Sequence, residues 1–418
     1  MASLNKVLTW RQGAGLTIAG VLGSGVLILP EVTAQMAGPA AMVAWLTMAC
    51  LAIPTAWTFG RLGTRYPDAG GIASYVRAAF GDRAGRMVGI LYLGTVPVAA
   101  PAAALIGAGY MGALLHWSNG AIVLLAAALL VTALVINLLG VEWSGKTATG
   151  IVLGISALLV AAVASAVTAV HWRNFGPFSP HGWWPVGQSI ALLYWAFVGW
   201  EMVGHLAEEF VDPVHNIPKS LGLAVVVIDV LYLSVVTVTI GTKSYDMGHS
   251  GAGLAKLVGL GLGPWGAMLT AVIALLITYG TMHTYIAGFS RLVYAQSRLG
   301  DLPPYFSKLH DTWHTPYRVL AMLVIPFAIV LGAKALFDVS LATLIAWPSA
   351  VFIALYLLAM ASAWRLLKAP TERFAALIVG LVSFAAFIFV GWAALLPAVL
   401  GLTGWAMAPT HEIPPQTY

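Results

Sequence analysis

Residues 19–31 read AGVLGSGVLILPE and lie inside the first long apolar stretch of the chain. This short segment contains three glycines, a serine and a proline, residue types that loosen or interrupt helices. In the hydrocarbon core every backbone N–H and C=O needs a partner, so unwound backbone is stable only where protein or a polar cavity surrounds it. Gly23, Ser24 and Gly25 therefore predict a break in the first span that lines a cavity. Close packing of two helices across small residues would leave the same pattern, and the segment alone does not separate these interpretations.

The composition of the whole chain indicates an integral membrane protein. Hydrophobic residues make up 60% of the 418 residues and charged residues only 8%. The mean hydropathy is +0.89, well outside the range of soluble domains. Stretches of about 20 apolar residues predict twelve membrane spans. Their approximate limits are 12–37, 40–62, 84–116, 120–140, 147–171, 186–210, 219–242, 264–297, 318–337, 341–365, 372–389 and 390–407. The last two share one apolar run, so eleven spans and an interfacial helix is the alternative.

The lysines and arginines predict the orientation, because cationic loops are retained in the cytoplasm. With a cytoplasmic N-terminus, only Arg173, Lys243, Lys256 and Lys334 of the 20 Lys and Arg residues lie outside. This predicts a multi-pass protein of the bacterial inner membrane with both termini cytoplasmic. The net charge of +5 follows from this topology and gives no reason to expect nucleic acid as a partner. The single cysteine, Cys50, excludes an intrachain disulfide, and no motif predicts a metal or a cofactor.

The sixth span contains a second irregularity, because Gly199 and the acidic Glu201 lie near its middle. Transporters built from inverted repeats have one interrupted helix in each half. We therefore predict an all-α transporter domain with one repeat over 12–171, a second over 186–365 and two additional spans over 372–407. The ends of half-helices offer free N–H groups to a carboxylate and free carbonyls to an ammonium, which suits a zwitterion.

Several motifs support this interpretation by resemblance. They are GVLGSGVLILP in the first span, RYPDAGGIASYVRAAFG after the second, AFVGWE in the sixth with EEFVDPVHNIPKSL after it, and SRLVYAQSRLGDLPPYFSKL after the eighth. In order and spacing they resemble the amino acid–polyamine–organocation (APC) transporter family, which has the leucine-transporter (LeuT) fold. The compact length and the sequence motif FVGWE…HLAEEF resemble the bacterial branch of the family that exports methionine and branched-chain amino acids. The stretch IASYVRAAFG, residues 72–81, predicts a short interfacial helix that ends at Gly81.

The resemblance assigns the parts of a bound amino acid to particular residues. It implies that Gly23, Ser24, Gly25 and the amide of Val26 bind the substrate carboxylate. It implies that the ammonium is bound by carbonyls of Trp195, Ala196 and Val198, with those near Ala19, Gly20 and Leu22. Phe197 resembles the aromatic outer gate, since a ring excludes water and approaches the ammonium face-on. Candidates for lining the side-chain pocket are Pro97, Val98, Pro101, Trp200, Tyr279, His283 and Trp347. Most of them are apolar or aromatic, which favours a neutral hydrophobic substrate.

The driving ion is less constrained by the sequence. Glu201 matches an acidic family position and is expected to be a structural hydrogen-bonding group, with a proton relay as the alternative. Asp229, in the middle of the seventh span, is either a protonated packing residue or a proton carrier. The coupling lysine that some relatives have in span five is absent near Gly154 and Ile155, whereas His283 and Thr284 are candidates for the cation region.

We expect a secondary transporter that exports methionine, leucine, isoleucine and valine by proton antiport. The alternatives are an exchanger, a sodium- or proton-coupled importer of other amino acids or amines, a channel, or a non-transporting sensor. Glu208 and Glu209, after the sixth span, are gating candidates. The stretch HLAEE, residues 205–209, lacks the final histidine of a metal-binding helix, so an enzyme is not expected.

Overall fold

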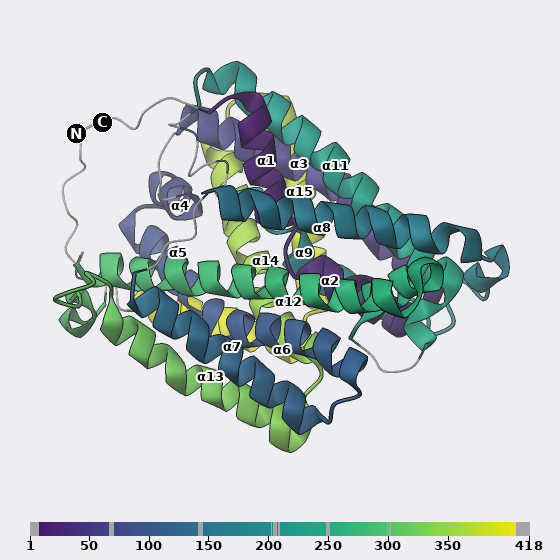
Figure 1. Ribbon diagram of the computed structural model, residues 1–418. Coiled ribbons are helices and arrows are strands. Elements are labelled where there is room, and N and C mark those ends of the chain that lie inside the picture. The colour runs from purple at the N-terminus through teal and green to yellow at the C-terminus, as the bar shows by residue number, and fades with distance from the viewer. Residues whose placement is uncertain are drawn as a thin grey trace.

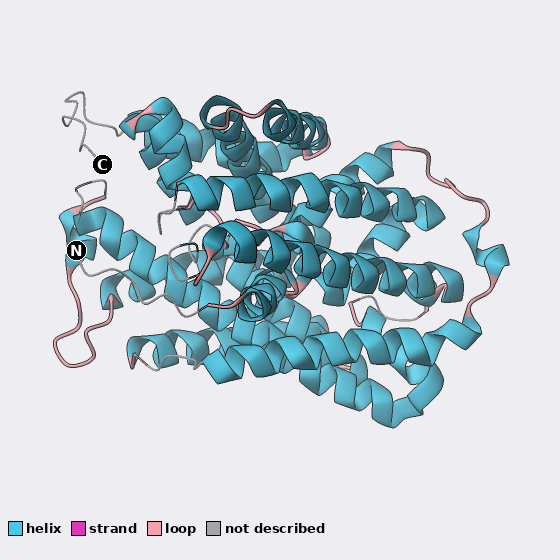
Figure 2. Cartoon of the chain, turned by 90° about the horizontal axis from the view of Figure 1, so that it is seen from above, coloured by secondary structure: helices cyan, strands magenta, loops and turns pink. Residues whose placement is uncertain are grey.

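The computed structural model describes residues 8–66, 71–140, 145–201, 203, 207, 210–247, 251–298, 300 and 302–406. Within these ranges the chain is helical, and the single β-bridge joins Leu8 to Phe210. Figure 2 shows helices and loops throughout the described part. The all-α membrane architecture expected from the composition is confirmed.

The first half begins with an interrupted helix. The spans are formed by α1 (Trp10–Val21) with α2 (Gly25–Ala37), α3 (Ala41–Arg65), α5 (Asp82–Leu93) with α6 (Val96–Leu115), α7 (Asn119–Leu138) and α8 (Gly145–Ala166). The short helix α4 (Ile72–Phe80) follows α3 and ends at Gly81, whose φ of +89° favours glycine. This is the helix predicted for residues 72–81.

The second half also begins with a helix that stops inside its predicted span. The helices are α9 (Trp184–Phe197), α11 (Pro213–Thr242), α12 (Gly253–Arg298), α13 (Tyr317–Phe337) and α14 (Leu341–Leu366), followed by α15 (Pro370–Ile388) and α16 (Leu395–Ala406). Gly263, with φ of +62°, and Pro264 divide α12 into a short helix over 253–262 and a long one that starts where the eighth span was predicted. The 12 residues of α16 extend about 18 Å, too short to cross a hydrocarbon core of about 30 Å.

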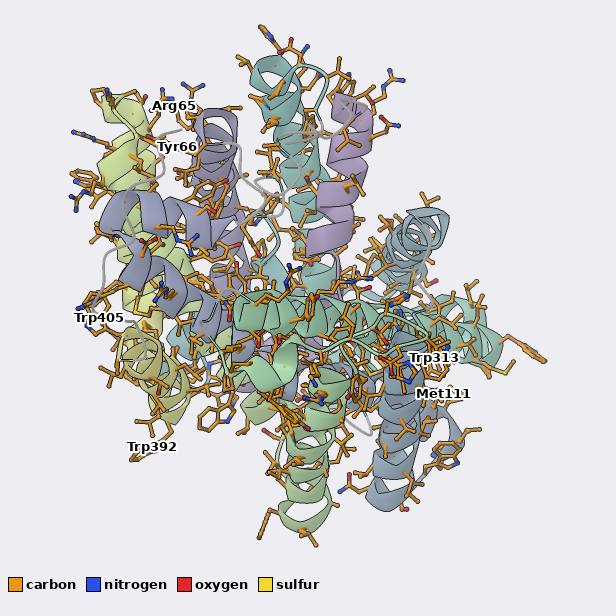
Figure 3. The ribbon with its side chains drawn as sticks, turned by 90° about the vertical axis from the view of Figure 1, so that its left-hand side faces the viewer. Arg65, Tyr66, Met111, Trp313, Trp392 and Trp405 are labelled. Atoms are coloured by element: carbon orange, nitrogen blue, oxygen red, sulfur yellow. The ribbon has the colours of Figure 1, made fainter. Side chains whose placement is uncertain are left out.

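Nine segments of the described chain are long and apolar enough to span a membrane, and one of them, Gly25–Arg65, combines α2 and α3. The interrupted sixth span and the short α16 fall below that length, and together with the merging of the first two predicted spans they account for the difference from twelve. Figure 1 shows α2 and α9 in the interior of the bundle; α12 packs on α2, and α8 packs on α1. Exposed aromatic side chains such as Trp392 and Trp405 point away from the bundle (Figure 3), as expected for a lipid-facing surface.

The ends of several helices meet on the side of the bundle where α1 begins, which we call the N-side. The Ser220 hydroxyl on α11 donates to the Trp10 carbonyl on α1 at 2.8 Å. Glu372, in the first turn of α15, is buried and accepts hydrogen bonds from Arg61 at 2.6 Å and Arg65 at 2.9 Å, near the end of α3. The starts of α1, α11 and α15 and the end of α3 therefore lie on the N-side.

Candidate substrate-binding site

The first span is interrupted at the segment predicted from glycine and serine. The helix α1 ends at Val21, and the Gly23 amide turns back to donate to the Val21 carbonyl at 2.8 Å. The helix α2 begins at Gly25, so its first amides have no carbonyl one turn earlier to bind. The Gly23 amide is thus used by the turn, whereas the amides of Ser24, Gly25 and Val26 stand at the start of a helix.

The sixth span is interrupted in the same way. The helix α9 ends at Phe197, and Val198 is extended with φ −80° and ψ +150°. Gly199 follows with φ of +125°, a conformation that glycine adopts readily and other residues rarely do. The last carbonyls of α9 and α1 therefore lack helical partners. Both breaks predicted from the sequence are present.

The two breaks are in direct contact. A Cβ atom added at Gly25 would lie 2.8 Å from the Trp195 ring and 3.0 Å from the Ala196 Cα. A Cβ atom added at Gly199 would lie 2.7 Å from the carbonyl oxygen of Gly20. Glycine is thus required where each helix approaches the other's unwound segment. At Gly23, in contrast, an added Cβ would meet no atom within 4 Å, so this position borders open space.

A tyrosine on a third helix joins the two breaks. The Tyr232 hydroxyl on α11 lies 3.1 Å from the Val21 carbonyl oxygen and 3.1 Å from the Ala196 carbonyl oxygen. Tyr232 is fully buried, so its hydroxyl satisfies backbone acceptors that water does not reach. Sequence reasoning missed this residue, because an aromatic residue in an apolar helix is usually a packing residue.

Each break also carries a buried side-chain donor that has no partner in the described structure. These donors are the Ser24 hydroxyl and the Trp200 indole N–H, on residues that are 1% exposed. A buried polar group without a partner is costly, and native structures seldom contain one unless water or a ligand binds it. Both residues were predicted to contact substrate.

Glu201 anchors the second break to α14. Its Oε2 atom accepts the Gly199 amide at 3.0 Å and the Tyr356 hydroxyl at 2.7 Å, and the residue is buried. The Tyr356 ring packs edge-on against Phe59 of α3 and Tyr194 of α9. These contacts fit the structural role expected for Glu201.

The aromatic residues at the end of α9 point in different directions. The Phe197 ring packs against Tyr232, with centroids 5.1 Å apart, and against Trp45 of α3 at 6.0 Å. The Trp195 ring lies beside Gly25 and packs edge-on against Tyr285 of α12 at 6.5 Å. The ring next to the start of α2 is therefore Trp195, and Phe197 belongs to a packed aromatic group with Trp45 and Tyr232.

The remaining pocket candidates are divided between several helices. The buried His283 contacts Asn137 of α7 through its Nδ1 atom at 3.0 Å, and Tyr279 stacks on it, so both lie on the side of α12 that packs on α7. The Thr284 hydroxyl donates to the Gly280 carbonyl of its own helix at 2.9 Å. Pro97 and Val98 on α6 and Trp347 on α14 are half-buried, and Pro101 on α6 is buried.

The coupling candidates are equally dispersed. Asp229 on α11 is half-buried, and its Oδ1 atom is buried with no partner in the described structure. The position of the coupling lysine in some relatives corresponds to Gly154 and Ile155 on α8, and neither residue carries an ammonium group. Ile155 is buried, and Gly154 borders open space. The gating candidates Glu208 and Glu209 lie outside the described residues. Groups of three or more His, Cys, Asp or Glu that could bind a metal ion do not occur among the described residues.

A buried acid that sequence reasoning missed lies in the middle of α2. Glu31 is 1% exposed, and it accepts the Lys256 ammonium at 2.6 Å and the Gly251 amide at 3.0 Å. Nearby, the Tyr110 hydroxyl donates to the Leu27 carbonyl at 2.6 Å and accepts the Leu254 amide at 3.3 Å. These bonds hold the segment 251–262 against α2 on the side opposite the N-side. The available signals were the proline before Glu31 and the position of Lys256 between the predicted seventh and eighth spans.

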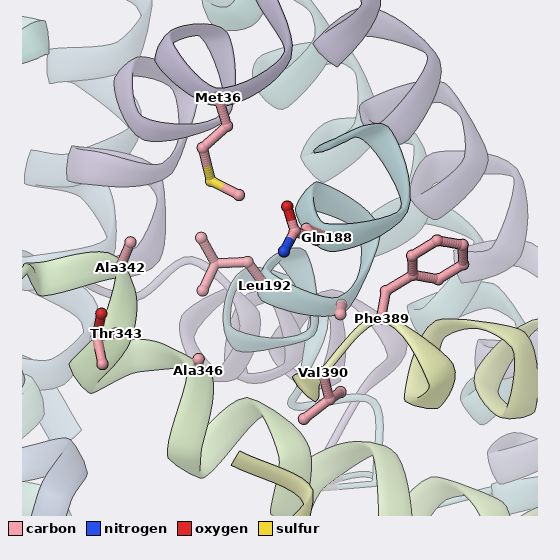
Figure 4. A pocket seen from close by; sticks show the side chains of 9 residues that line it. Met36, Gln188, Leu192, Ala342, Thr343, Ala346, Phe389 and Val390 are labelled. Atoms are coloured by element: carbon pink, nitrogen blue, oxygen red, sulfur yellow. The ribbon is translucent and has the colours of Figure 1, made fainter. Parts of the chain in front are cut away.

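The pocket in Figure 4 lies near this opposite side and has a volume of about 190 Å³. Met36, Gln188, Leu192, Thr343 and Phe389, from α2, α9, α14 and the residue after α15, are among the residues that line it. Its lining includes none of the residues predicted from the sequence to bind substrate.

Comparison with known proteins agrees with this geometry. A family model described as "Amino acid permease" matches residues 8–413. The chain is 41% identical to the uncharacterized amino acid permease YecA of Bacillus subtilis, covering 97% of this chain and 96% of the relative. It is 30% identical to the L-methionine/branched-chain amino acid exporter YjeH of Escherichia coli, covering 99% of each chain.

A solved structure shows the fold. The crystal structure of a manganese transporter from Eremococcus coleocola superposes with a TM-score of 0.57 at 11% identity, covering 97% of this chain and 95% of the other. The relatives are transporters rather than enzymes, as expected from the sequence. The chain therefore belongs to the amino acid permease family, as its motifs indicated, and has the fold of a membrane transporter.

Proposed function

We propose that the protein is a secondary transporter of neutral hydrophobic amino acids, namely methionine, leucine, isoleucine and valine, which binds its substrate between the two interrupted helices. The observation that carries the proposal is the contact between the breaks, which brings the start of one helix and the ends of two others together. The amides at the start of α2 form the positive end of a helix dipole, and the carbonyls at the ends of α1 and α9 form negative ends. These suit the carboxylate and the ammonium group of a zwitterionic amino acid.

The two charged groups of the substrate are assigned accordingly. The carboxylate binds the amides of Ser24, Gly25 and Val26, with the orphaned Ser24 hydroxyl and Trp200 indole as further donors. Gly23 contributes space rather than a donor, because its amide is used by the turn. The ammonium binds carbonyls at the ends of α1 and α9, drawn from Ala19, Gly20, Leu22, Trp195, Ala196 and Val198.

The aromatic cover over the substrate is assigned to Trp195 rather than to Phe197. The Trp195 ring lies beside Gly25, where the carboxylate binds, and packs edge-on against Tyr285 of α12. Phe197 instead stabilises the break through Trp45 and Tyr232. A neutral apolar side chain suits a site of this kind, since a charged one would need a dedicated partner.

The direction and the coupling ion are inferred from the relatives and from Asp229. The name of the Escherichia coli relative describes an exporter, and the similarity extends over nearly the whole chain. Asp229 is an acid within a span whose Oδ1 atom has no partner in the described structure, so it is the candidate carrier of a counter-transported proton. The excess of Lys and Arg in N-side segments favours a cytoplasmic N-side in a bacterial inner membrane.

Alternating access would then involve two repeats, 12–171 and 186–365, each of which begins with an interrupted helix. The last two segments, 372–407, lie outside the repeats.

The test is uptake of labelled methionine, leucine, arginine and glutamate into proteoliposomes, with imposed pH or sodium gradients or with unlabelled amino acid inside. We expect methionine and leucine flux that requires a pH gradient and is lost in Gly25→Leu. The matched control is Gly332→Ala on α13, where an added Cβ meets no atom within 4 Å. Flux that needs internal amino acid would indicate an exchanger, and sodium dependence a sodium-coupled carrier. Ligand binding without flux would indicate a sensor.

A further inference from the structure

We propose that a pocket at the N-side ends of α4, α14 and α15 binds the headgroup of an anionic phospholipid. The pocket has a volume of about 490 Å³ and is lined by Phe80, Ala361, Trp364, Arg365 and Arg373. Its lining includes no residue of the two helix breaks, and neither the family match nor the relatives assign it a role. The inference does not depend on which amino acid is transported.

Two guanidinium groups give the pocket its charge. The Arg365 guanidinium carbon lies 5.4 Å from the centroid of the Phe80 ring, and that of Arg373 lies 6.0 Å from the Trp364 ring. The Arg373 Nε atom donates to the Leu367 carbonyl at 2.9 Å, which fixes the direction of its side chain. The terminal nitrogens of Arg373 then remain as a fork for an oxyanion.

The acid adjacent to Arg373 in sequence is already used by other arginines. Glu372, next to Arg373 in sequence, binds Arg61 and Arg65 and also accepts the Ala369 amide at 3.4 Å. Within the described part of the chain, neither Arg365 nor Arg373 has a carboxylate within ion-pair distance. An anion from outside the protein would therefore pair with the guanidinium groups of Arg365 and Arg373.

The apolar surroundings favour a lipid over a free anion. The Phe80, Trp364 and Phe374 side chains are 42%, 47% and 63% exposed beside the arginines. Aromatic residues at the ends of spans lie at the level of the headgroups, and arginines there attract anionic lipids. A phospholipid would place its phosphate between the guanidinium groups and its acyl chains along the exposed rings, whereas inorganic phosphate would use only the first contact.

The test uses the purified full-length protein in a neutral detergent with phosphatidylglycerol, phosphatidylcholine or inorganic phosphate added separately. Binding is followed by native mass spectrometry and by thermal unfolding. The variants are Arg365→Gln, Arg373→Gln and the double variant. Lys368→Gln is the matched control, because this exposed cation lies between the two arginines in sequence but does not line the pocket.

We expect phosphatidylglycerol to bind and stabilise the wild type and the Lys368→Gln control, whereas phosphatidylcholine and phosphate do not. Each arginine substitution weakens phosphatidylglycerol binding about fivefold, and both together weaken it about 30-fold. Equal binding by the double variant would overturn the proposal, and so would inorganic phosphate binding as tightly as the lipid. If the double variant does not fold, the single glutamine variants decide the question: each is expected to bind phosphatidylglycerol about fivefold more weakly than the wild type, and single variants that bind like the wild type would also overturn the proposal.

Discussion

The Tyr232 hydroxyl is the sharpest single test of the two-break site. Tyr232→Phe keeps the ring and its contacts with Trp45 and Phe197 but removes the only hydrogen that the hydroxyl can donate. The Val21 carbonyl still accepts the Gly23 amide at 2.8 Å, whereas the Ala196 carbonyl loses its side-chain donor. A buried carbonyl that has lost its donor lowers the free energy of unfolding by about 1–3 kcal/mol.

The loss of this hydrogen bond should lower both the stability of the protein and its affinity for substrate, because the bond joins the two segments that we propose bind substrate. We expect the unfolding temperature to fall by a few degrees and the KM for the best transported amino acid to rise about fivefold or more. The measurements are thermal unfolding in detergent and initial rates of uptake into proteoliposomes.

Tyr194→Phe is the control for the loss of a buried hydroxyl. Tyr194 donates to the Ser383 hydroxyl at 2.8 Å, away from the break carbonyls, and Ser383 still donates to its own helix without it. This variant should lose comparable stability and keep the wild-type KM. If Tyr232→Phe changed the KM no more than Tyr194→Phe does, the bridging role of Tyr232 would be refuted.

Three further predictions concern separate contacts. Each is checked by thermal unfolding, and the first also by uptake. Gly199→Ala should cost more than about 2 kcal/mol and abolish uptake, because the residue has φ of +125° and its new Cβ would lie 2.7 Å from the Gly20 carbonyl; wild-type uptake would contradict the close approach. Lys256→Met should lower the free energy of unfolding by about 3 kcal/mol, because it leaves Glu31 buried and unpaired. Adding Glu31→Gln should recover most of this loss, whereas additive losses in the double variant would exclude direct coupling of the two residues. Glu372→Gln should cost about 1 kcal/mol, a modest loss because the arginines bound to it are partly exposed; an unchanged unfolding temperature would show that water replaces the bond fully.

The spans and both breaks were predictable because their signals are local. Apolar length sets the limits of a span. The Gly23–Gly25 segment alone also fits close helix packing, but a second irregularity at Gly199 and Glu201 favours a break in each of the two spans. The end of the chain was less certain, because the sequence does not show that Phe389 to Gly391 stop α15 and leave only a short α16.

Residues that act through distant contacts were harder to place. Glu31 and Lys256 are 225 positions apart, and only the folded chain shows that the ammonium reaches the carboxylate. The rotation of α9 is set by packing, so sequence alone could not decide whether Trp195 or Phe197 lies beside the start of α2. The contact between His283 and Asn137 joins two helices that the sequence alone does not connect.

The contacts at the two breaks and the Glu31–Lys256 ion pair differ in the free energy needed to separate them. At the breaks, Gly25 and Gly199 bring backbone against the neighbouring helix, and the Tyr232 hydroxyl satisfies buried carbonyls, so separation would expose several acceptors at once. The Glu31–Lys256 pair is different, because the attraction of a buried ion pair is largely offset by the loss of hydration, and the charges regain water when they part. In an alternating-access cycle the segment 251–262 is therefore the part expected to release α2, while the two breaks move together as one unit.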